Sequence, residues 1–331
     1  MKITEEKTQK KKFKLFDMNR DGKGVYEEES RKPTLGFFFK LYFRKFTQLL
    51  QLNLMMLFMV IPLIAVVFIY FLGDKTPTMT DALYAPLYGI ATSSPSADVA
   101  NILDLASIQM EIPVFNHTMI VLIIVLFVFM AITWGWQNVG SAYVLRGLFR
   151  GDAVFVFSDY FYGIKRNFKQ AFFLGIIDFV ISAVLIIDFI FFFNLTGSFA
   201  LDFMYFAIMA LLIIWIMMRF YLYNLLVTFD LKNFKIIKNS FIFSILGIKR
   251  NIMAFLGIAL LIVIHILLIF VFIPLGISIP LVLPLVYLIS TIGFMATYAA
   301  FPIIQKYMID PYVTESLDSN ISENVNDTDI V

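Results

Sequence analysis

The chain has 331 residues, of which 60% are hydrophobic and only 15% are charged, and its formal net charge is +2. Soluble domains are about half apolar and about a quarter charged, so this composition predicts an all-α integral membrane protein, and the small net charge argues against nucleic-acid binding. The absence of cysteine excludes disulfides, thiol catalysis and Cys-held iron–sulfur clusters, and two histidines are too few for a His-rich metal site.

Residues 1–36 are predicted to form a charged cytoplasmic tail. Within it DMNRDGKGVYEE, from Asp17 to Glu28, has the ligand spacing of an EF-hand calcium loop. Its eighth position is Gly24 rather than an apolar residue, Pro33 interrupts the exit helix, and there is no second loop to pair with. The pattern is interpreted as a chance match, and calcium is not expected as a ligand.

Six apolar stretches are long enough to span a membrane, because a helix needs about 20 mostly apolar residues to cross a hydrocarbon core of about 30 Å. Backbone groups in lipid must bond within their own segment, so these spans are predicted to be helices. Prolines in or near them are interpreted as kinks; these are Pro62, Pro274, Pro284 and Pro302. The six-span domain covers residues 37–312, with spans at about 46–72, 115–137, 170–195, 203–227, 252–274 and 281–303.

Lys and Arg residues predict the orientation of these spans, because they favour the cytoplasmic side. The tail through Lys45 carries 13 of them, and the segments after the second and fourth spans carry five each. The outer loop, residues 74–113, has Lys75 alone. Both termini are therefore predicted to be cytoplasmic, in a plasma-membrane protein that contacts the lipid bilayer. The acidic segment 313–331 is predicted to be disordered.

Two cytoplasmic segments resemble one another, which indicates an internal repeat. GIKRNFKQAFFLGI at 163–176 is similar to GIKRNIMAFLGI at 247–258, and an amphipathic stretch typical of an interfacial helix precedes each. GFFFKLYFRKFTQLLQLNL, near the first span, is a weaker third copy. The copies have the same orientation, so they predict parallel repeats. The alternative is that basic residues before any inward-facing span look alike.

Four segments in order resemble the YesL-like family, bacterial integral membrane proteins that carry a domain of unknown function. They are residues 37–54, 141–178, 227–252 and 301–312, the second reading SAYVLRGLFRGDAVFVFSDYFYGIKRNFKQAFFLGIID. The resemblance is to the longer, Gram-positive type of member. It implies an accessory or transport role linked to carbohydrate uptake, and it brings no catalytic residue.

Four polar residues lie inside predicted spans, where an ionisable side chain is a functional candidate: Asp178, Arg219, Asp188 and His265. Asp178 and Arg219 have matching depths if the third and fourth spans form a hairpin, so they are predicted to pair; the alternative is that Arg219 reaches the headgroups. His265 has a depth similar to that of Asp188 and is a candidate for a functional role that involves a proton. The alternative, which we favour, is a neutral histidine bonded to a backbone carbonyl. Trp134 and Trp136 are interpreted as an aromatic belt at a span end.

No sequence pattern of a catalytic, cofactor or metal site is present, so an enzyme is not predicted. The scarcity of polar residues in the spans favours an accessory or scaffold protein that works with an uptake complex. The alternative is a transporter or channel for a small solute, which would need polar residues at several depths.

Overall fold

The structure is a computed structural model that describes residues 33–73, 75–77, 111–195 and 198–312. The EF-hand-like stretch, residues 1–32, most of the predicted outer loop and the tail 313–331 lie outside the described residues. The described part is helical apart from two three-residue strands, β1 (Lys75–Pro77) and β2 (Glu111–Pro113), which pair antiparallel.

Six helical stretches are long and apolar enough to cross a membrane, which confirms the prediction of an all-helical, multi-pass protein. The first five are α2 (Phe46–Leu72), α5 (His117–Arg150), α7 (Phe168–Phe193), α8 (Phe199–Thr228) and α10 (Ile248–Phe272). The sixth is continuous but irregular, and consists of α11 (Ile279–Leu283), the π-helix η2 (Pro284–Leu288), α12 (Ile289–Ile304) and the π-helix η3 (Gln305–Ile309). Large apolar side chains are exposed along the spans, as expected for surfaces that contact a lipid bilayer.

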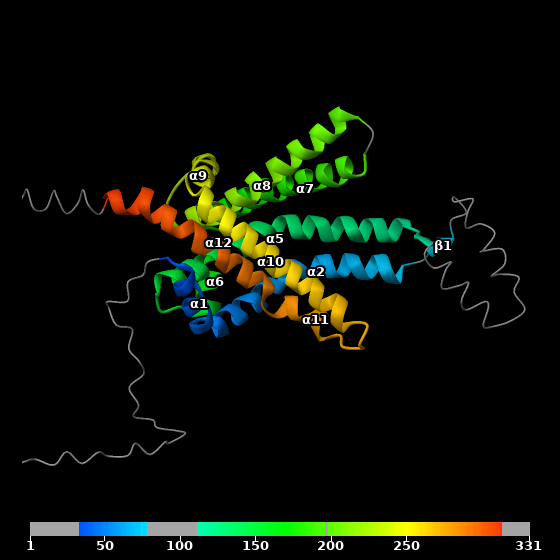
Figure 1. Cartoon of the computed structure of the whole chain (residues 1–331), viewed down its shortest axis with the longest axis horizontal. Coiled ribbons are helices and arrows are strands. Elements are labelled where there is room, and N and C mark those ends of the chain that lie inside the picture. Colours follow the sequence, from blue (N-terminus) through cyan, green and yellow to red (C-terminus); the bar gives the residue numbers. More distant parts are fainter. Residues whose placement is uncertain (1–32, 74, 78–110, 196–197, 313–331) are drawn as a thin grey trace, which may run out of the picture.

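The spans form a bundle in which α5, α8 and α12 each pack against the other two. Three further helices pack outside this trio: α2 against α5, α7 against α8, and α10 against α12. Three short helices, α1 (Leu35–Arg44), α6 (Val156–Arg166) and α9 (Asn233–Leu246), lie together at one end of the bundle (Figure 1). We call this the junction end. The β1–β2 pair, the end of α7 and the start of α8 lie at the opposite end (Figure 1).

Helix α5 is much longer than the predicted span, which ended at residue 137. The additional turns carry small and polar residues that lower the hydropathy, but they are buried against α6 and α8. The ring of Tyr160, on α6, packs so closely on Gly140 that a Cβ there would lie 2.8 Å from it. Burial raises the pKa of the Tyr160 phenol. The helix ends where Gly151 adopts φ 78°, the left-handed conformation that glycine tolerates.

Each short helix joins its span through one residue with the same bent backbone. The junction residues are Lys45 (φ −103°, ψ 10°), Asn167 (φ −114°, ψ 19°) and Gly247 (φ −91°, ψ 14°). Helices α1 and α6 are amphipathic as predicted, whereas α9 has large apolar side chains on exposed as well as buried sides, including Phe234 at 79% exposure. For description we divide the described helices into three segments: A (α1, α2, α5), B (α6, α7, α8) and C (α9, α10 and the sixth span).

Equivalent side chains connect these segments in a ring. Three residues after the junction residue, Gln48, Gln170 and Arg250 each donate a hydrogen bond to the backbone of the next segment. The accepting carbonyls always lie two residues before a short helix, and belong to Val154 (3.3 Å), Leu231 and Pro33 (3.4 Å). We call the three contacts seams A/B, B/C and C/A. Because C returns to A, the segments close around the α5–α8–α12 trio.

Candidate functional site

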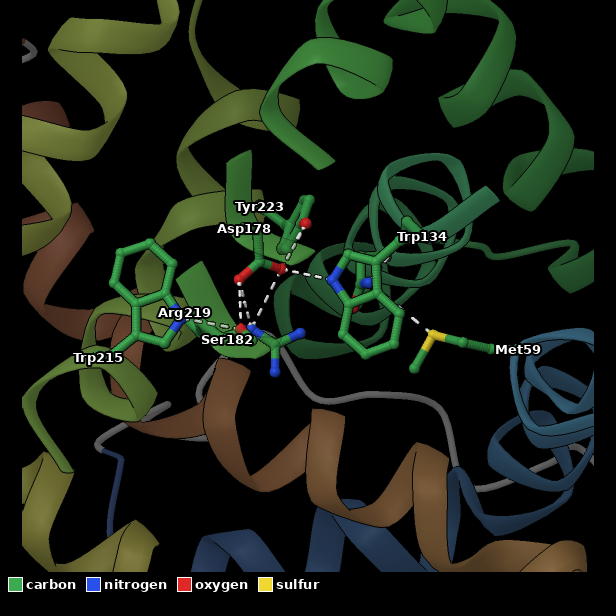
Figure 2. Close-up of polar contacts among 8 residues, drawn as sticks. Met59, Trp134, Asp178, Ser182, Trp215, Arg219 and Tyr223 are labelled. Carbon is green, nitrogen blue, oxygen red and sulfur yellow. Dashed lines mark hydrogen bonds and ion pairs between the residues drawn. The ribbon is translucent and has the colours of Figure 1, made fainter. Parts of the chain in front are cut away.

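The most strongly connected polar group in the bundle is the carboxylate of Asp178, on α7, which has no solvent exposure. Its Oδ2 accepts hydrogen bonds from Trp134 Nε1 and from the Tyr223 hydroxyl, both at 2.7 Å (Figure 2). Ser182, one turn further along α7, donates to Oδ1 at 3.4 Å. The donors come from α5, α7 and α8, so the carboxylate joins segment A to segment B.

Arg219 completes this site from α8. Its Nε lies 2.9 Å from Asp178 Oδ1 and 3.2 Å from Oδ2, and its guanidinium carbon is 5.2 Å from the centre of the Trp134 ring. The structure thus brings Asp178 and Arg219 into direct contact, and the snorkelling alternative does not describe this geometry. The Arg219 side chain retains 28% exposure, and its Nη1 and Nη2 make no hydrogen bond within the described residues.

A second layer of contacts fixes these groups. Trp215 Nε1 donates to Ser182 Oγ at 2.9 Å, so α8 holds the hydroxyl that faces Asp178 (Figure 2). On the other side, Trp134 packs edge-on against Phe179, with ring centres 5.6 Å apart. Aromatic rings thus pack around the Asp178 carboxylate, which has no solvent exposure, and opposite charges interact more strongly in such surroundings than in water.

The close approach of α5 and α7 positions Trp134 against Asp178. A Cβ on Gly135 would lie 1.9 Å from the Ala171 carbonyl oxygen, and one on Gly175 would lie 2.2 Å from the Gly135 Cα. Only glycine permits backbones to touch in this way, a device common in membrane helices. Gly135 directly follows Trp134, so the same contact that joins the helices sets the depth of the indole.

The chemistry available to this site is limited by its hydrogen bonds. The guanidinium of Arg219 and the donors of Trp134, Tyr223 and Ser182 occupy both oxygens of the Asp178 carboxylate. Among the described residues, no group of three or more His, Cys, Asp or Glu side chains could hold a metal ion. The arrangement neutralises two charges inside the membrane and locks three helices together.

A second polar site lies where α2 meets the sixth span. Asn53 Nδ2 donates to the Leu285 carbonyl at 2.5 Å, and its Oδ1 accepts from the Ser290 backbone N–H at 2.9 Å. These backbone groups belong to the π-helix η2 and the start of α12, directly after Pro284. Asn53 therefore satisfies backbone groups at the irregular part of the span, as the bilayer interior requires.

His265, on α10, is buried with 3% exposure. Its Nδ1 lies 3.2 Å from the Tyr287 hydroxyl, and its Nε2 has no hydrogen-bond partner among the described residues. The expectation of a neutral histidine bonded to a backbone carbonyl is wrong in its partner, which is a side-chain hydroxyl of η2. Asp188 lies near the far end of α7, half-buried, with no hydrogen bond or ion pair within the described residues.

Sequence reasoning missed most of the partners of Asp178. The aromatic-belt interpretation of Trp134 is wrong, because its indole lies within α5 and donates to a buried carboxylate. Trp136 likewise bonds to the Phe168 carbonyl at 3.0 Å and stacks on the Phe168 ring. Tyr223 stands one turn after Arg219, so the helical spacing of these two residues was the signal that could have identified it.

Comparison with protein-family models, curated proteins and solved structures finds no match to this chain. The functional interpretation therefore depends on the geometry of the bundle and on the resemblance described above.

Proposed function

We propose that this protein is a non-enzymatic accessory or scaffold protein of the plasma membrane that works with a carbohydrate-uptake complex. The observation that carries the proposal is the set of hydrogen bonds around Asp178. Four donor groups from α5, α7 and α8 converge on this carboxylate, which leaves no free lone pair for a solute. Such a group stabilises a rigid frame, and this is the property that a scaffold requires.

The proposed orientation places the junction end in the cytoplasm. Of the described Lys and Arg residues, all but Lys75 and Arg219 lie in the short helices or at the span ends near them, which supports this orientation through the positive-inside rule. A reporter fused after Val331 should be active only in the cytoplasm, and one inserted near Ser94 only outside. The opposite result at either position would contradict the orientation.

The proposed architecture is a parallel repeat of three copies. Its support is the recurrence of one junction geometry and of one hydrogen bond at the same distance from each junction. Chance similarity of basic segments would not produce matching contacts between successive segments. Membership of the YesL-like family, with the link to sugar uptake that this resemblance implies, belongs to the same proposal.

The decisive experiment compares uptake of several labelled sugars in a deletion strain with uptake by the purified protein in proteoliposomes. An accessory protein predicts reduced uptake in the deletion strain and no flux across the proteoliposome membrane. Flux through the purified protein would replace the proposal with the transporter alternative. Unchanged uptake of every sugar in the deletion strain would remove the carbohydrate link.

A further inference from the structure

An apolar groove of about 400 Å³ opens at seam C/A, between α1, α10 and α12. This volume lies within the range of about 300–1,000 Å³ that is typical of ligand sites. Phe38 forms part of its wall and packs on Phe294 and Tyr298 of α12, with ring centres 5.5 and 5.2 Å apart. The groove is thus a defined space between anchored helices.

The α10 wall of the groove is a continuous stripe. Arg250, Met253, Gly257, Leu260 and Ile264 recur at helical spacing along it. From Arg250 to Ile264 the helix rises about 21 Å, which exceeds the half-thickness, about 15 Å, of the hydrocarbon core. A groove of this length that starts near the end of a span matches one extended acyl chain of a single leaflet.

The two ends of the groove differ in chemistry. At the junction end stands the Arg250 guanidinium, which donates to the carbonyls of Pro33, Tyr298 and Ala299. These bonds use three of the five N–H donors of arginine, and two remain. Lys249 is exposed beside it, whereas the far end is lined mainly by apolar side chains such as Leu261 and Ile264. A positive end and an apolar end are complementary to an anionic headgroup and its acyl chain.

Side chains at the rim favour a lipid occupant. Phe39, Phe43 and Leu260 lie on the groove and are 56%, 71% and 60% exposed, on the surface where the spans contact the bilayer. We propose that the groove at seam C/A binds an anionic phospholipid, with its phosphate at Arg250 and one acyl chain along α10 as far as Ile264. This proposal is independent of the role in carbohydrate uptake.

The experiment uses the full chain in nanodiscs with a photoactivatable phosphatidylglycerol that carries a diazirine in its acyl chain. Labelled peptides should map to α1, α10 and α12. Gly257→Phe fills the groove, and its added Cβ meets only the flexible end of Met295, at 2.7 Å; labelling of these helices should fall about tenfold. The matched control is Leu256→Phe, on the neighbouring residue that is 61% exposed and lies outside the groove, where labelling should change by less than about twofold.

The headgroup is tested by repeating the labelling with the phosphatidylcholine analogue. Preference for phosphatidylglycerol should persist in Arg250→Lys and be lost in Arg250→Gln. Equal labelling by both lipids in the unaltered protein would overturn the anionic assignment, and unchanged labelling in a Gly257→Phe protein that retains its thermal unfolding temperature would overturn the site. Increased labelling after deletion of residues 1–32 would also overturn it, by identifying that segment as the occupant.

Discussion

At seams A/B and C/A a span contacts the backbone of the neighbouring segment at equivalent positions, but through different residues. Gly175 and Asn53 both stand eight residues after their junction residues, Asn167 and Lys45. At seam A/B, Gly175 has no side chain, so α7 touches the backbone of α5. At seam C/A, the Asn53 amide extends to the backbone of η2 and α12. Equivalent positions thus join the segments by direct backbone contact in one seam and through a side chain in the other.

The difference between the seams extends to their electrostatics. Seam A/B buries a full carboxylate, which four donors surround and Arg219 neutralises. At seam C/A the buried bridging group is the uncharged amide of Asn53, and a groove is left beside α1. Close packing at seam A/B indicates a rigid frame, whereas the groove at seam C/A indicates a surface that can accept another molecule. The predictions below test this contrast.

The largest effect is expected at Asp178. Asp178→Asn leaves Arg219 without its counter-charge inside the membrane, at a cost of about 2.5–3.5 kcal/mol. Arg219→Gln should be similarly destabilising, and the double variant should recover part of the loss because the two residues are in contact. Thermal unfolding in detergent measures each variant. Asp188→Asn on the same helix is the control and should change stability little; additive losses in the double variant would contradict the lock.

The next effect is expected at the glycine contact of seam A/B. Gly175→Ala places a Cβ against the Gly135 backbone, so the helices must separate, at a cost of about 1–3 kcal/mol or more. Gly257→Ala is the matched change in segment C, where the added atom meets only the flexible methyl group of Met295. The unfolding temperature should fall clearly for Gly175→Ala and little for Gly257→Ala. Equal falls in unfolding temperature for the two variants would mean that the helices at seam A/B are packed no more tightly than those around Gly257.

A smaller effect is expected at Asn53. Asn53→Leu leaves the Leu285 carbonyl and the Ser290 N–H without a partner, which costs about 1–3 kcal/mol when a buried group loses its hydrogen bond. The change should also increase amide hydrogen exchange in η2 and the start of α12, and this local readout separates it from a general loss of packing. Asn194→Ala, at an exposed residue that bonds only to its own helix end, is the control. Unaltered exchange in η2 would contradict the bridging role of Asn53.

The smallest effect is expected at the hydroxyl that faces His265. Tyr287→Phe removes one hydrogen bond at 3.2 Å, which contributes about 0.5–1.5 kcal/mol. His265→Gln can still bond to the Tyr287 hydroxyl, so its unfolding temperature should change less than that of the Tyr287 variant. A larger loss for His265→Gln would show that the imidazole has a further partner at Nε2.

The sequence predicted the six spans and the depth match of Asp178 with Arg219, because hydropathy and a rise of about 1.5 Å per residue are local properties. It could not predict Trp134 as a donor, because small residues such as Gly140 and Ser141 end the apolar run early while the helix continues. The hydrogen bonds that close the ring of segments could not be predicted for a different reason. Gln48, Gln170 and Arg250 occupy one position but differ in residue type, and the backbone carbonyls that they bind carry no sequence signature.

The irregular sixth span shows a further limit of sequence reasoning. Pro284 was interpreted as the site of a kink, but the structure has a π-helix there. The Leu285 carbonyl in this π-helix accepts a hydrogen bond from Asn53, more than 200 residues away in the chain. Tertiary contacts of this kind decide local geometry, and no local pattern reports them.

The ring of segments also has a temporal consequence. The hydrogen bonds that form the seams join residues separated in the sequence by 61 positions at B/C, 106 at A/B and 217 at C/A. Contacts distant in sequence form late, because the closure of a long loop costs more entropy. Helix α1 is synthesised before the other described helices, yet its packing site at seam C/A is complete only after α12 has entered the membrane. Until then Phe38 lacks its partners on α12, so the first of the described helices to be made is among the last to be fixed.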